Sequence, residues 1–313
     1  MKPEILLIEP MMESIEAKLD GNYRVHRLFQ AQDRAAFISG IASNIGGIVT
    51  GGGSGASNAL VDALPALEII AINGIGTDAV DLEHARRRRI RVTTTPDVLT
   101  DDVADLAIAL LLATARRLCV GDRYIREGRW EKRENLPLAH RVSGKKLGIL
   151  GMGRVGRAIA NRAAPFGMQI AYHDLRAFSD VAHRYERDLE TLARWCDFFV
   201  VAAAGGAQSR GLVGARVIDA LGPDGVLVNV ARGSVVDEPT LVSALVEGRL
   251  GGAGLDVFAD EPSVPKALWS LDNVVLQPHR ASATVETRIA MGELVLESLA
   301  SHFAGKEPKT AVV

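Results

Sequence analysis

The stretch KLGILGMGRVGRAIANRAAPFGMQIAYHD, residues 146–174, decides how the second half of the chain folds. It opens with a short apolar run typical of a buried strand and turns through three glycines with the spacing G-x-G-x-x-G. It then continues with Ile159, Ala163 and Phe166 at helical spacing, and a second apolar run ends at Asp174. Strand, glycine turn, helix and strand in this order predict the start of a doubly wound parallel sheet.

The glycines of this turn, Gly151, Gly153 and Gly156, have the spacing of a loop that binds a dinucleotide. In such a loop the first glycine permits the tight turn and the second lets the backbone approach the pyrophosphate, while the third lets the helix pack closely on the strand. The helix begins near Arg154 and Val155, and its N-terminus offers free N–H groups and a partial positive charge to the phosphates. The turn is therefore predicted to bind NAD(H) or NADP(H).

The second strand of this unit ends at Asp174, where dinucleotide sites place an acid about twenty residues beyond the first glycine. A carboxylate here would bind the ribose hydroxyls of NAD(H) and repel the 2′-phosphate of NADP(H). Arg176 and Arg154 carry guanidinium groups that would instead bind that phosphate. The sequence favours NAD(H) without excluding NADP(H).

Short Val- and Ile-rich runs alternate with helical patterns along the whole chain, as expected for parallel α/β sheets. In the first third, we predict strands at residues 5–8, 23–28, 47–49, 67–72 and 90–93, and helices at 56–63 and 77–88. A long helical pattern from residue 100 to about 128 precedes further strands at 147–150, 169–174, 198–203, 225–230, 252–258 and 273–277. A last helix is predicted at 283–303.

These elements predict an α/β chain with two doubly wound parallel-sheet domains. The six strands of the second series match a Rossmann NAD(P)-binding domain, which we expect at residues 98–283. Residues 1–97 and 284–313 are expected to form a smaller, discontinuous, flavodoxin-like domain that binds the substrate.

The composition bears on the possible partners. The 313 residues include 36 Lys and Arg against 38 Asp and Glu, so the net charge of −2 gives no electrostatic reason to bind nucleic acid or an anionic membrane. Cys119 and Cys196 lack partners at metal-ligand spacing, so we expect two buried thiols and no metal site. No run reaches the ~20 apolar residues of a membrane span, and the acidic start MKPEILLIEP does not resemble a signal peptide. A cytoplasmic location is therefore expected.

Three later strands are each followed by a polar residue, at the edge of the sheet where open α/β sheets bind ligands. Arg232 lies in VLVNVARGSVVDE, Glu261 in GLDVFADEP and His279 in NVVLQPHRASAT. Taken singly, these residues are typical of a surface charge, a turn and a loop. The three segments in this order form a recognisable set.

With these segments, with GMGRVG and with the stretch NGIGTDAVDLEHARRRRIRVTTTPDVLTDDVADLAIALLL, the chain resembles the D-isomer-specific 2-hydroxyacid dehydrogenase family. Within that family it resembles the glyoxylate/hydroxypyruvate reductase branch. The resemblance implies an oxidoreductase that transfers a hydride from NAD(P)H to small 2-keto acids, with its active site in a cleft between two domains, and a homodimer. Leu175 stands where NADP-using members of the branch commonly carry Arg.

The resemblance also implies a role for each catalytic candidate. Arg232 would hold the substrate carboxylate and keto oxygen through its rigid, bidentate guanidinium. His279 would donate a proton to the carbonyl oxygen as the hydride arrives at the carbon. Glu261 would pair with His279, fix its tautomer and favour its charged form.

Further positions match segments that line the family's site. In the first domain, a glycine-rich loop would bind the substrate carboxylate and a second loop would line the same cleft; these loops contain Asn73, Gly74, Ile75 and Gly76, and Gly52 and Gly53. In the second domain, Asp256 matches a position that contacts the nicotinamide carboxamide, and Val230 and Ala231 would lie along the nicotinamide ribose. Ala203, at the end of a predicted strand, is a further cofactor-binding candidate.

Two other functions stay open at this point. A D-lactate or phosphoglycerate-type dehydrogenase of the same family differs mainly in the shape of its pocket. A non-enzymatic, NAD(H)-sensing protein of the corepressor type would share the fold. The presence of Arg232, Glu261 and His279 together favours an enzyme.

Overall fold

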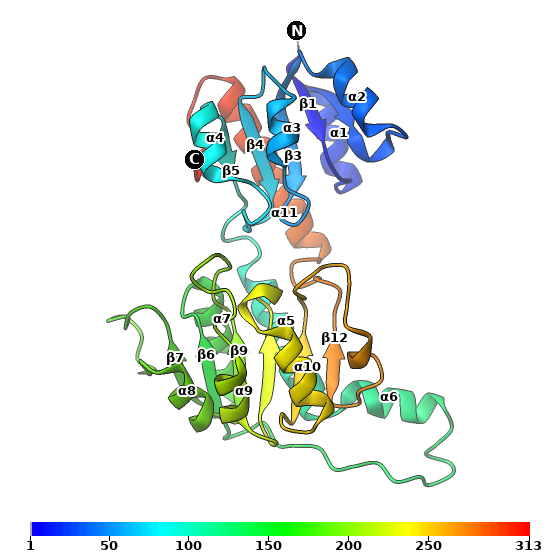
Figure 1. Cartoon of the computed structure of the whole chain (residues 1–313), viewed down its shortest axis with the longest axis vertical. Helices are drawn as coiled ribbons and strands as arrows, with labels where there is room; N and C mark the ends of the chain where they lie inside the picture. The colour runs from blue at the N-terminus through cyan, green and yellow to red at the C-terminus, as the bar shows by residue number, and fades with distance from the viewer. Residues whose placement is uncertain (1) are drawn as a thin grey trace. The chain divides into compact units, whose positions relative to one another are not determined.

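The structure is a computed structural model that describes residues 2–313. The chain forms two compact units, of which the first joins Met1–Leu99 to Ser282–Val313 and the second is Thr100–Ala281. Each unit contains one parallel sheet, of five strands in the first and seven in the second, which confirms the predicted α/β class. In Figure 1 the first unit runs from blue to cyan and returns in red, whereas the second runs through green and yellow to orange.

The sheet of the first unit has the order β2-β1-β3-β4-β5, which reverses direction between β1 and β3. This is the flavodoxin-like order, and such sheets bind ligands at the carboxyl ends of the strands where the order reverses. The strands are β1 (Glu4–Leu7), β2 (Arg24–Arg27), β3 (Ile45–Gly51), β4 (Ile69–Asn73) and β5 (Arg91–Thr93).

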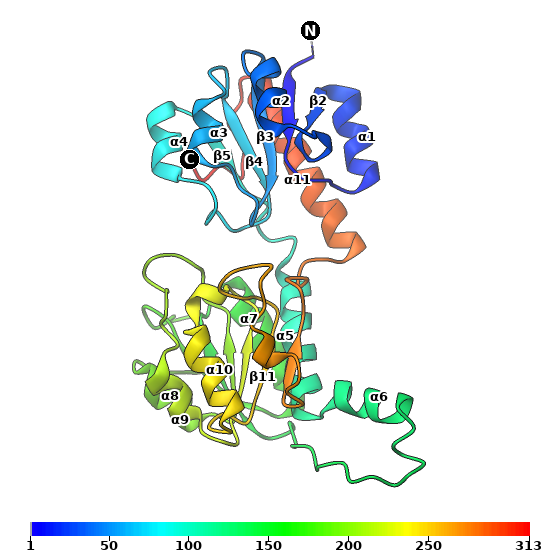
Figure 2. The same ribbon diagram turned by 45° about the vertical axis from the view of Figure 1, so that its right-hand side comes forward.

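Helices cover both faces of this sheet (Figure 2). Ile5 and Leu7 of β1 pack with α1 (Glu13–Asn22) and α11 (Val285–Phe303), while Leu6 packs with the helices of the opposite face. Those helices are α2 (Arg34–Ile41), α3 (Asn58–Asp62) and α4 (Leu82–Arg88). Because successive strand residues point to opposite faces, a strand buried on both sides is apolar throughout, as this one is.

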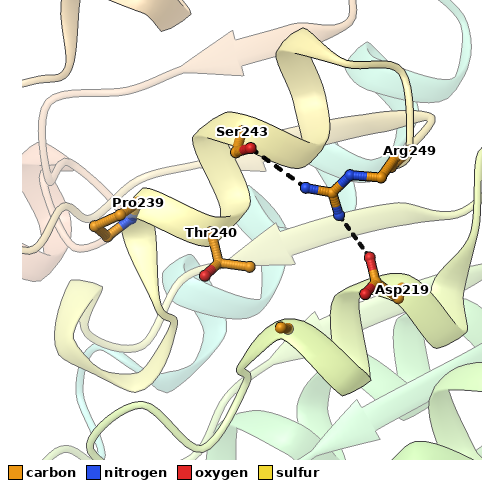
Figure 3. Close-up of a pocket in the computed structure, with 6 residues that line it drawn as sticks. Asp219, Pro239, Thr240, Ser243 and Arg249 are labelled. Carbon is orange, nitrogen blue, oxygen red and sulfur yellow. Dashed lines mark hydrogen bonds and ion pairs between the residues drawn. The ribbon is translucent and has the colours of Figure 1, made fainter.

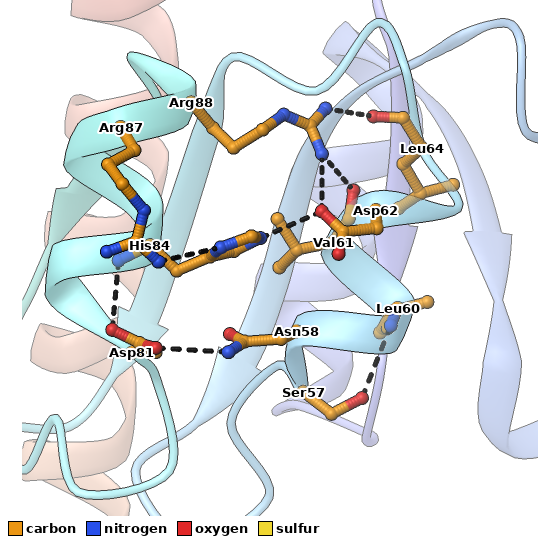
Figure 4. A network of polar contacts seen from close by, with 10 residues as sticks. All are labelled: Ser57, Asn58, Leu60, Val61, Asp62, Leu64, Asp81, His84, Arg87 and Arg88. Carbon is orange, nitrogen blue, oxygen red and sulfur yellow. Dashed lines mark hydrogen bonds and ion pairs between the residues drawn. The ribbon is translucent and has the colours of Figure 1, made fainter.

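A network of polar contacts joins α3 to α4 (Figure 4). Oδ1 of Asp62 accepts hydrogen bonds from Nε2 of His84 at 2.8 Å and from Nη1 of Arg88 at 2.9 Å. These bonds, that of His84 foremost, hold the pKa of Asp62 below its ordinary value. Nδ2 of Asn58 donates to Oδ2 of Asp81 at 3.0 Å, and Oδ1 of Asp81 accepts the N–H of His84 and so caps α4. The network fixes the two helices against each other at the surface.

The sheet of the second unit has the order β12-β11-β10-β9-β6-β7-β8. The run from β8 to β11 is the 3-2-1-4-5-6 order of a dinucleotide-binding sheet, to which β12 adds an edge strand. The strands are β6 (Lys146–Leu150), β7 (Gln169–His173), β8 (Arg184–Tyr185), β9 (Phe198–Val201), β10 (Val226–Asn229), β11 (Gly252–Leu255) and β12 (Val274–Leu276).

One face of this sheet is covered by α5 (Thr100–Ala115) and α7 (Arg154–Ala163). The other face buries a core contributed by α8 (Leu189–Trp195), α9 (Ala215–Leu221) and α10 (Glu238–Val246). Short 3-10 helices lie at Leu28–Gln30, Ala164–Phe166, Gly233–Val235 and Lys266–Leu268.

The long helix predicted from residue 100 to about 128 is two helices in the structure. Thr114 and Ala115 are buried at the end of α5, but Arg116 is exposed and Arg117 adopts a φ of 52°. Because a pair of arginines is costly to bury, the chain turns here, and α6 (Leu118–Arg126) begins at the surface.

Other differences are smaller. The helix predicted at residues 77–88 begins only at Leu82, because Asp81 caps it. No bounds were predicted for the helices α1, α2, α8, α9 and α10, and the two-residue strand β8 was not predicted. Cys119 is exposed on α6, contrary to expectation, whereas Cys196 is buried and burial raises the pKa of its thiol to about 12.

Candidate functional site

The glycine-rich turn joins β6 to α7 at the point where the strand order of the second unit reverses. Gly151 has a φ of 94°, and a Cβ at this position would lie 2.6 Å from the backbone of Ala203, which follows β9. A Cβ on Gly156 would meet the carbonyl group of Gly151. The packing of the chain itself therefore requires glycine at both positions.

Gly153 differs from these two glycines, because no atom lies within 4 Å of the Cβ that it would carry. The chain alone does not require glycine here, whereas the close approach of a pyrophosphate does. Gly153 is the N-cap of α7, and the next N–H groups, on Arg154 and Val155, have no acceptor within the helix. The turn therefore fits the pyrophosphate of a dinucleotide.

Asp174 follows β7 and is tied to this turn. Its Oδ2 accepts the N–H of Met152 at 2.8 Å, and its Oδ1 accepts the N–H of Leu175 at 2.7 Å. The carboxylate is thus held beside the glycines, where dinucleotide sites bind the adenosine ribose. Arg176 is exposed, and its guanidinium lies 5.8 Å from the centre of the Phe178 ring.

Arg157 on α7 joins the loop after β7 to the glycine-rich turn, and the sequence did not point to this residue. Nη1 and Nη2 of Arg157 donate to the carboxylate of Asp180 at 2.8 and 3.1 Å, and Nε donates to the carbonyl of Met152 at 3.2 Å. The guanidinium also lies 5.1 Å from the centre of the Phe178 ring. The contacts with Asp180 and Phe178 join residues more than twenty positions apart, so local spacing carries no signal for them.

Asp256, which follows β11, organises the turn that contains His279. Asp256 is 0% exposed, and its backbone carbonyl accepts the N–H of His279 at 2.8 Å. Its carboxylate accepts the N–H of Arg280 at 2.7 Å and that of Ala281 at 3.0 Å. Burial raises the pKa of Asp256, although these two backbone hydrogen bonds act to lower it. The three bonds hold His279 at a φ of 51°, which is uncommon outside glycine.

His279 and Glu261 form a hydrogen-bonded pair, with 2.6 Å between Nδ1 and Oε2. Because a carboxylate only accepts hydrogen bonds, Nδ1 is the donor of this pair. Oε1 of Glu261 accepts the N–H of Phe258 at 3.0 Å. Burial acts to raise the pKa of Glu261, but these two hydrogen bonds and the charges of His279 and Arg232 hold it below its ordinary value. Glu261 is therefore ionised at neutral pH.

The position of Arg232 after β10 depends on Asn229, which the sequence did not single out. Asn229 is 1% exposed; its Nδ2 donates to the carbonyl of Arg232 at 3.0 Å, and its Oδ1 accepts the N–H of Ala231 at 3.0 Å. Nη1 of Arg232 donates to the carbonyl of Ala231 at 2.6 Å. A buried amide at the end of a strand was the available signal. The side chains of Val230 and Ala231 are buried, so they belong to the interior of this unit.

The structure thus brings Arg232, Glu261 and His279 together. They follow β10, β11 and β12, which are neighbours in the sheet, and the charge of Arg232 acts on the carboxylate of Glu261. A guanidinium beside an imidazole–carboxylate pair can bind an anion and transfer a proton to it.

In the first unit, two glycine-rich loops lie against each other at the carboxyl ends of β3 and β4. A Cβ on Gly52 would lie 3.2 Å from the carbonyl oxygen of Gly76, and one on Gly74 would lie 3.4 Å from the nitrogen of Gly52. Gly53 is exposed, and no atom lies within 4 Å of the Cβ that it would carry. The backbones of these loops are therefore in contact, and side chains would hold them apart.

Polar groups at this edge lack partners. Within residues 2–313, the backbone N–H groups of Ile75 and Gly76 donate to no backbone carbonyl. In the same part of the chain, the buried Oδ1 of Asn73 accepts no hydrogen bond. Free backbone N–H groups in a glycine-rich loop can approach and bind a small anion.

A hollow of about 520 Å³ lies between α9 and α10 of the second unit (Figure 3). Arg249 extends into it and donates to Asp219 at 2.6 Å and to Ser243 at 3.3 Å. None of the residues predicted from the sequence lines this hollow, and its charged groups pair with one another. It is therefore not a candidate for the active site.

Within residues 2–313, no three His, Cys, Asp or Glu side chains are placed to hold a metal ion. None of the helices in this range is both long enough and apolar enough to cross a membrane. The compartment in which the protein acts stays a prediction.

The sequence of this chain matches a known enzyme family. The family model for the NAD-binding domain of D-isomer-specific 2-hydroxyacid dehydrogenases matches residues 108–281. The chain belongs to this family. The resemblance predicted from its motifs is confirmed, and so are the oxidoreductase class and the use of NAD(P) as cofactor.

Relatives of this dehydrogenase match it along almost its whole length. The 2-ketogluconate reductase of Gluconobacter oxydans is 45% identical over 312 residues, which cover 100% of this chain and 99% of that protein. A glyoxylate/hydroxypyruvate reductase A of Arabidopsis thaliana is 45% identical over 309 residues, 99% of this chain and 98% of that protein. The crystal structure of an NADPH-dependent glyoxylate/hydroxypyruvate reductase from Sinorhizobium meliloti, in complex with NADP and malonate, matches with a TM-score of 0.91 at 40% identity. That match covers 100% of this chain and 97% of the other.

Proposed function

We propose that this dehydrogenase reduces small 2-keto acids, among them glyoxylate and hydroxypyruvate, to D-2-hydroxy acids with NAD(P)H. The observation that carries the proposal is the hydrogen-bonded pair of His279 and Glu261 next to Arg232. The pair follows the strands of a sheet whose glycine-rich turn fits a dinucleotide. The names of the similar proteins, which are reductases of 2-keto acids, support it.

In this proposal the second unit binds the cofactor, and the first unit binds the substrate carboxylate. In the second unit, Gly151, Gly153 and Gly156 bind the pyrophosphate, and Asp174 binds the adenosine ribose. The nicotinamide supplies the hydride when the cofactor is bound. In the first unit, the free N–H groups of the loop after β4 bind the substrate carboxylate.

The acid–base step follows from the geometry of the pair. Nδ1 of His279 donates to Glu261, so Nε2 is the nitrogen that gives its proton to the carbonyl oxygen of the substrate. The ionised Glu261 accepts the hydrogen of Nδ1 and so fixes the tautomer and orientation of the imidazole for this transfer. Arg232 binds the carboxylate and polarises the keto oxygen, a bidentate task that a lysine would perform poorly. Asp256 keeps the His279 turn in place.

The test is the oxidation of NADH and NADPH, followed by absorbance, with glyoxylate, hydroxypyruvate, pyruvate and phosphohydroxypyruvate as acceptors. The change His279→Ala should lower kcat by about 10²–10⁴-fold, the usual contribution of a general acid. The affinity for NADH, measured by fluorescence titration, should stay within about twofold, because His279 is proposed to act on the substrate. Turnover retained in His279→Ala would refute the assigned role. Tight NADH binding without turnover of any acceptor would favour the NAD(H)-sensing alternative.

We also propose that the protein is a homodimer that associates through residues 118–138 of the second unit. In both views, α6 and the loop after it extend away from the sheet (Figures 1 and 2). Leu118, Trp130 and Leu138 in this segment are 57%, 67% and 92% exposed, and the segment lines a hollow of about 550 Å³. Large exposed apolar patches mark interaction sites, and most oligomers of soluble proteins pair identical chains.

Light scattering coupled to gel filtration tests the dimer. The wild-type protein should have twice the chain mass of 33.4 kDa. The change Leu138→Asp should shift it towards the monomer at micromolar concentration, because a carboxylate would be buried in the interface. Val246→Asp is the matched control, since Val246 on α10 is 56% exposed but lies outside the segment. A wild-type monomer at these concentrations would refute this part of the proposal.

A further inference from the structure

Glu9 lies two residues beyond the end of β1, at the carboxyl edge of the first unit's sheet. Leu7 of β1 pairs with Val49 of β3, and the same register carried forward places Glu9 beside Gly51. Gly51 in turn pairs with Asn73 of β4. Side chains at paired positions of parallel strands point to the same face, so Glu9, Gly51 and Asn73 form one row across three neighbouring strands.

This row is where a ligand is expected from the topology alone. The strand order of the first unit reverses between β1, which ends two residues before Glu9, and β3, which ends at Gly51. Open α/β sheets bind their ligands outside the carboxyl ends of the strands at such a reversal.

The chain leaves room for the Glu9 carboxylate. A Cβ on Gly51 would lie 2.7 Å from Cδ of Glu9, so any larger residue at position 51 would displace this carboxyl group. The hydroxyl of Ser54 donates a hydrogen bond to Oε2 of Glu9. The Glu9 side chain is therefore held over the glycine loop, and it is only partly buried.

The polar groups of this edge define the chemistry of a ligand. The carboxylate of Glu9 accepts hydrogen bonds and cannot donate them. Oδ1 of Asn73, in the same row, is buried and accepts no hydrogen bond within residues 2–313. The N–H groups of Ile75 and Gly76 are donors that suit an anion. A complementary ligand therefore has an anionic head and carries hydroxyl groups that donate to Glu9 and Asn73.

We infer that Glu9 determines substrate specificity and selects 2-keto acids with a hydroxylated chain, as in acids derived from sugars. This inference rests on the proposed function, because it places the substrate carboxylate at the loop after β4. Neighbouring strands lie about 4.8 Å apart, so the backbone of Glu9 is roughly 10 Å from that of Asn73 along the row. Glyoxylate has no chain to extend along the row, whereas a longer polyhydroxy acid does. The charge of Glu9 repels a second carboxylate, and it offers an apolar chain no favourable contact.

The experiment compares kcat/KM for four acceptors in the wild-type enzyme and in Glu9→Ala. The acceptors are 2-ketogluconate, its unhydroxylated counterpart 2-ketohexanoate, the dicarboxylate 2-ketoglutarate, and glyoxylate. A hydrogen bond to a charged group contributes enough that Glu9→Ala should lower kcat/KM for 2-ketogluconate by about 10- to 100-fold, mainly through KM. The value for glyoxylate should stay within about twofold of the wild type, and that for 2-ketoglutarate should rise.

Two further variants and a binding measurement accompany this comparison. Glu9→Gln keeps the volume and one acceptor, so it should fall between the wild type and Glu9→Ala. Glu13→Gln is the matched control and should behave as the wild type, because Glu13 is exposed in the first turn of α1. The rise in unfolding temperature caused by gluconate, the reduced acid, should be smaller in Glu9→Ala than in the wild type. If Glu9→Ala does not fold, Glu9→Gln serves for both measurements.

The outcomes separate this inference from the proposed function. If the wild-type enzyme reduces none of the acceptors, glyoxylate included, the proposed function fails. If it reduces glyoxylate and Glu9→Ala lowers kcat/KM for all acceptors alike, or for none, only the inference is overturned. A wild-type preference for 2-ketohexanoate over 2-ketogluconate overturns it as well.

Discussion

Nδ1 of His279 donates to Oε2 of Glu261 at 2.6 Å, and the same histidine is held at a φ of 51° by a turn built on Asp256. One carboxylate thus accepts the hydrogen of Nδ1 and fixes the tautomer of the imidazole, while the other fixes the position of the histidine. The two acids sit in different surroundings, and their pKa values move in opposite directions, downwards for Glu261 and upwards for Asp256. Their substitution is therefore expected to have different consequences.

Glu261→Gln should remove stability that depends on pH. The pKa of Glu261 is lowered in the folded state. Its contribution to the free energy of unfolding is therefore present above the ordinary pKa of 4.5 and is lost as the pH falls through the lower pKa of the folded protein. The side chain is 33% exposed, so we expect about 1 kcal/mol or less at pH 7. Urea titrations at pH 7 and pH 3.5 measure this, and the stability difference from the wild type should shrink at pH 3.5. The same variant should lower kcat, since the imidazolium loses its partner; an unchanged kcat would contradict the role of the pair.

Asp256→Ala should disrupt the turn that presents His279. The N–H groups of Arg280 and Ala281 would lose their acceptors, which we expect to cost about 2–3 kcal/mol of unfolding free energy. Asp256→Asn should lower the free energy of unfolding by less, because the single amide oxygen of Asn can still accept one of the two N–H groups. The pKa of Asp256 is raised, so its own contribution is greatest at low pH and falls as pH rises through that value. The stability difference between wild type and Asp256→Asn should therefore narrow with rising pH, opposite to Glu261→Gln, and a parallel trend would contradict this account.

Much of this site could be predicted from the sequence, because its residues occur at fixed spacings or directly after apolar strands. The glycines at 151, 153 and 156 and the acid at 174 occur at spacings fixed by one strand–turn–helix unit. Arg232, Glu261 and His279 each follow an apolar strand, and parallel strands bring their carboxyl ends to one edge. Asn229 and Asp256 hold these segments through hydrogen bonds to backbone groups, and neither was predicted in this role, because the partners of a buried polar side chain are known only in the folded chain.

What could not be predicted depends on contacts between distant segments. Arg157 reaches Asp180 across two loops, and Glu9 lies over Gly51 only because β1 and β3 are adjacent. The break after α5 also escaped prediction, since the helical pattern continues through Arg116 and Arg117. The chain turns where α5 leaves the buried interior, since Thr114 and Ala115 are buried and Arg116 is exposed.

Gly153→Ala and Gly156→Ala should separate cofactor binding from folding. Gly156→Ala places a Cβ against the carbonyl of Gly151, so it should destabilise the protein by about 1–3 kcal/mol. Gly153→Ala meets no protein atom and should cost under ~1 kcal/mol as an N-cap substitution. It should nevertheless weaken NADH binding at least tenfold, because the Cβ would stand where the pyrophosphate approaches. Denaturant titration and NADH fluorescence measure the two effects, and wild-type NADH affinity in Gly153→Ala would show that the pyrophosphate lies elsewhere.

The choice between the two nicotinamide cofactors should be decided by Asp174. Its carboxylate is held by the N–H groups of Met152 and Leu175, so turning it away from the ribose would break two hydrogen bonds. The 2′-phosphate of NADPH would then lie near a fixed negative charge, and like charges in such contact cost several kcal/mol. The exposed Arg176 offers only partial compensation. We expect tighter binding of NADH than of NADPH in the wild type, and a shift of at least tenfold towards NADPH in Asp174→Ala.

Arg176→Ala completes this test, with fluorescence titration of both cofactors as the measurement. If Asp174 dominates, Arg176→Ala should weaken NADPH binding by less than about tenfold, the effect of an exposed ion pair, and leave NADH binding unchanged. If the wild type instead binds NADPH more tightly and Arg176→Ala abolishes that preference, then the guanidinium governs the choice. Asp174 would in that case hold only the glycine-rich turn, through the hydrogen bond between its Oδ2 and the N–H of Met152.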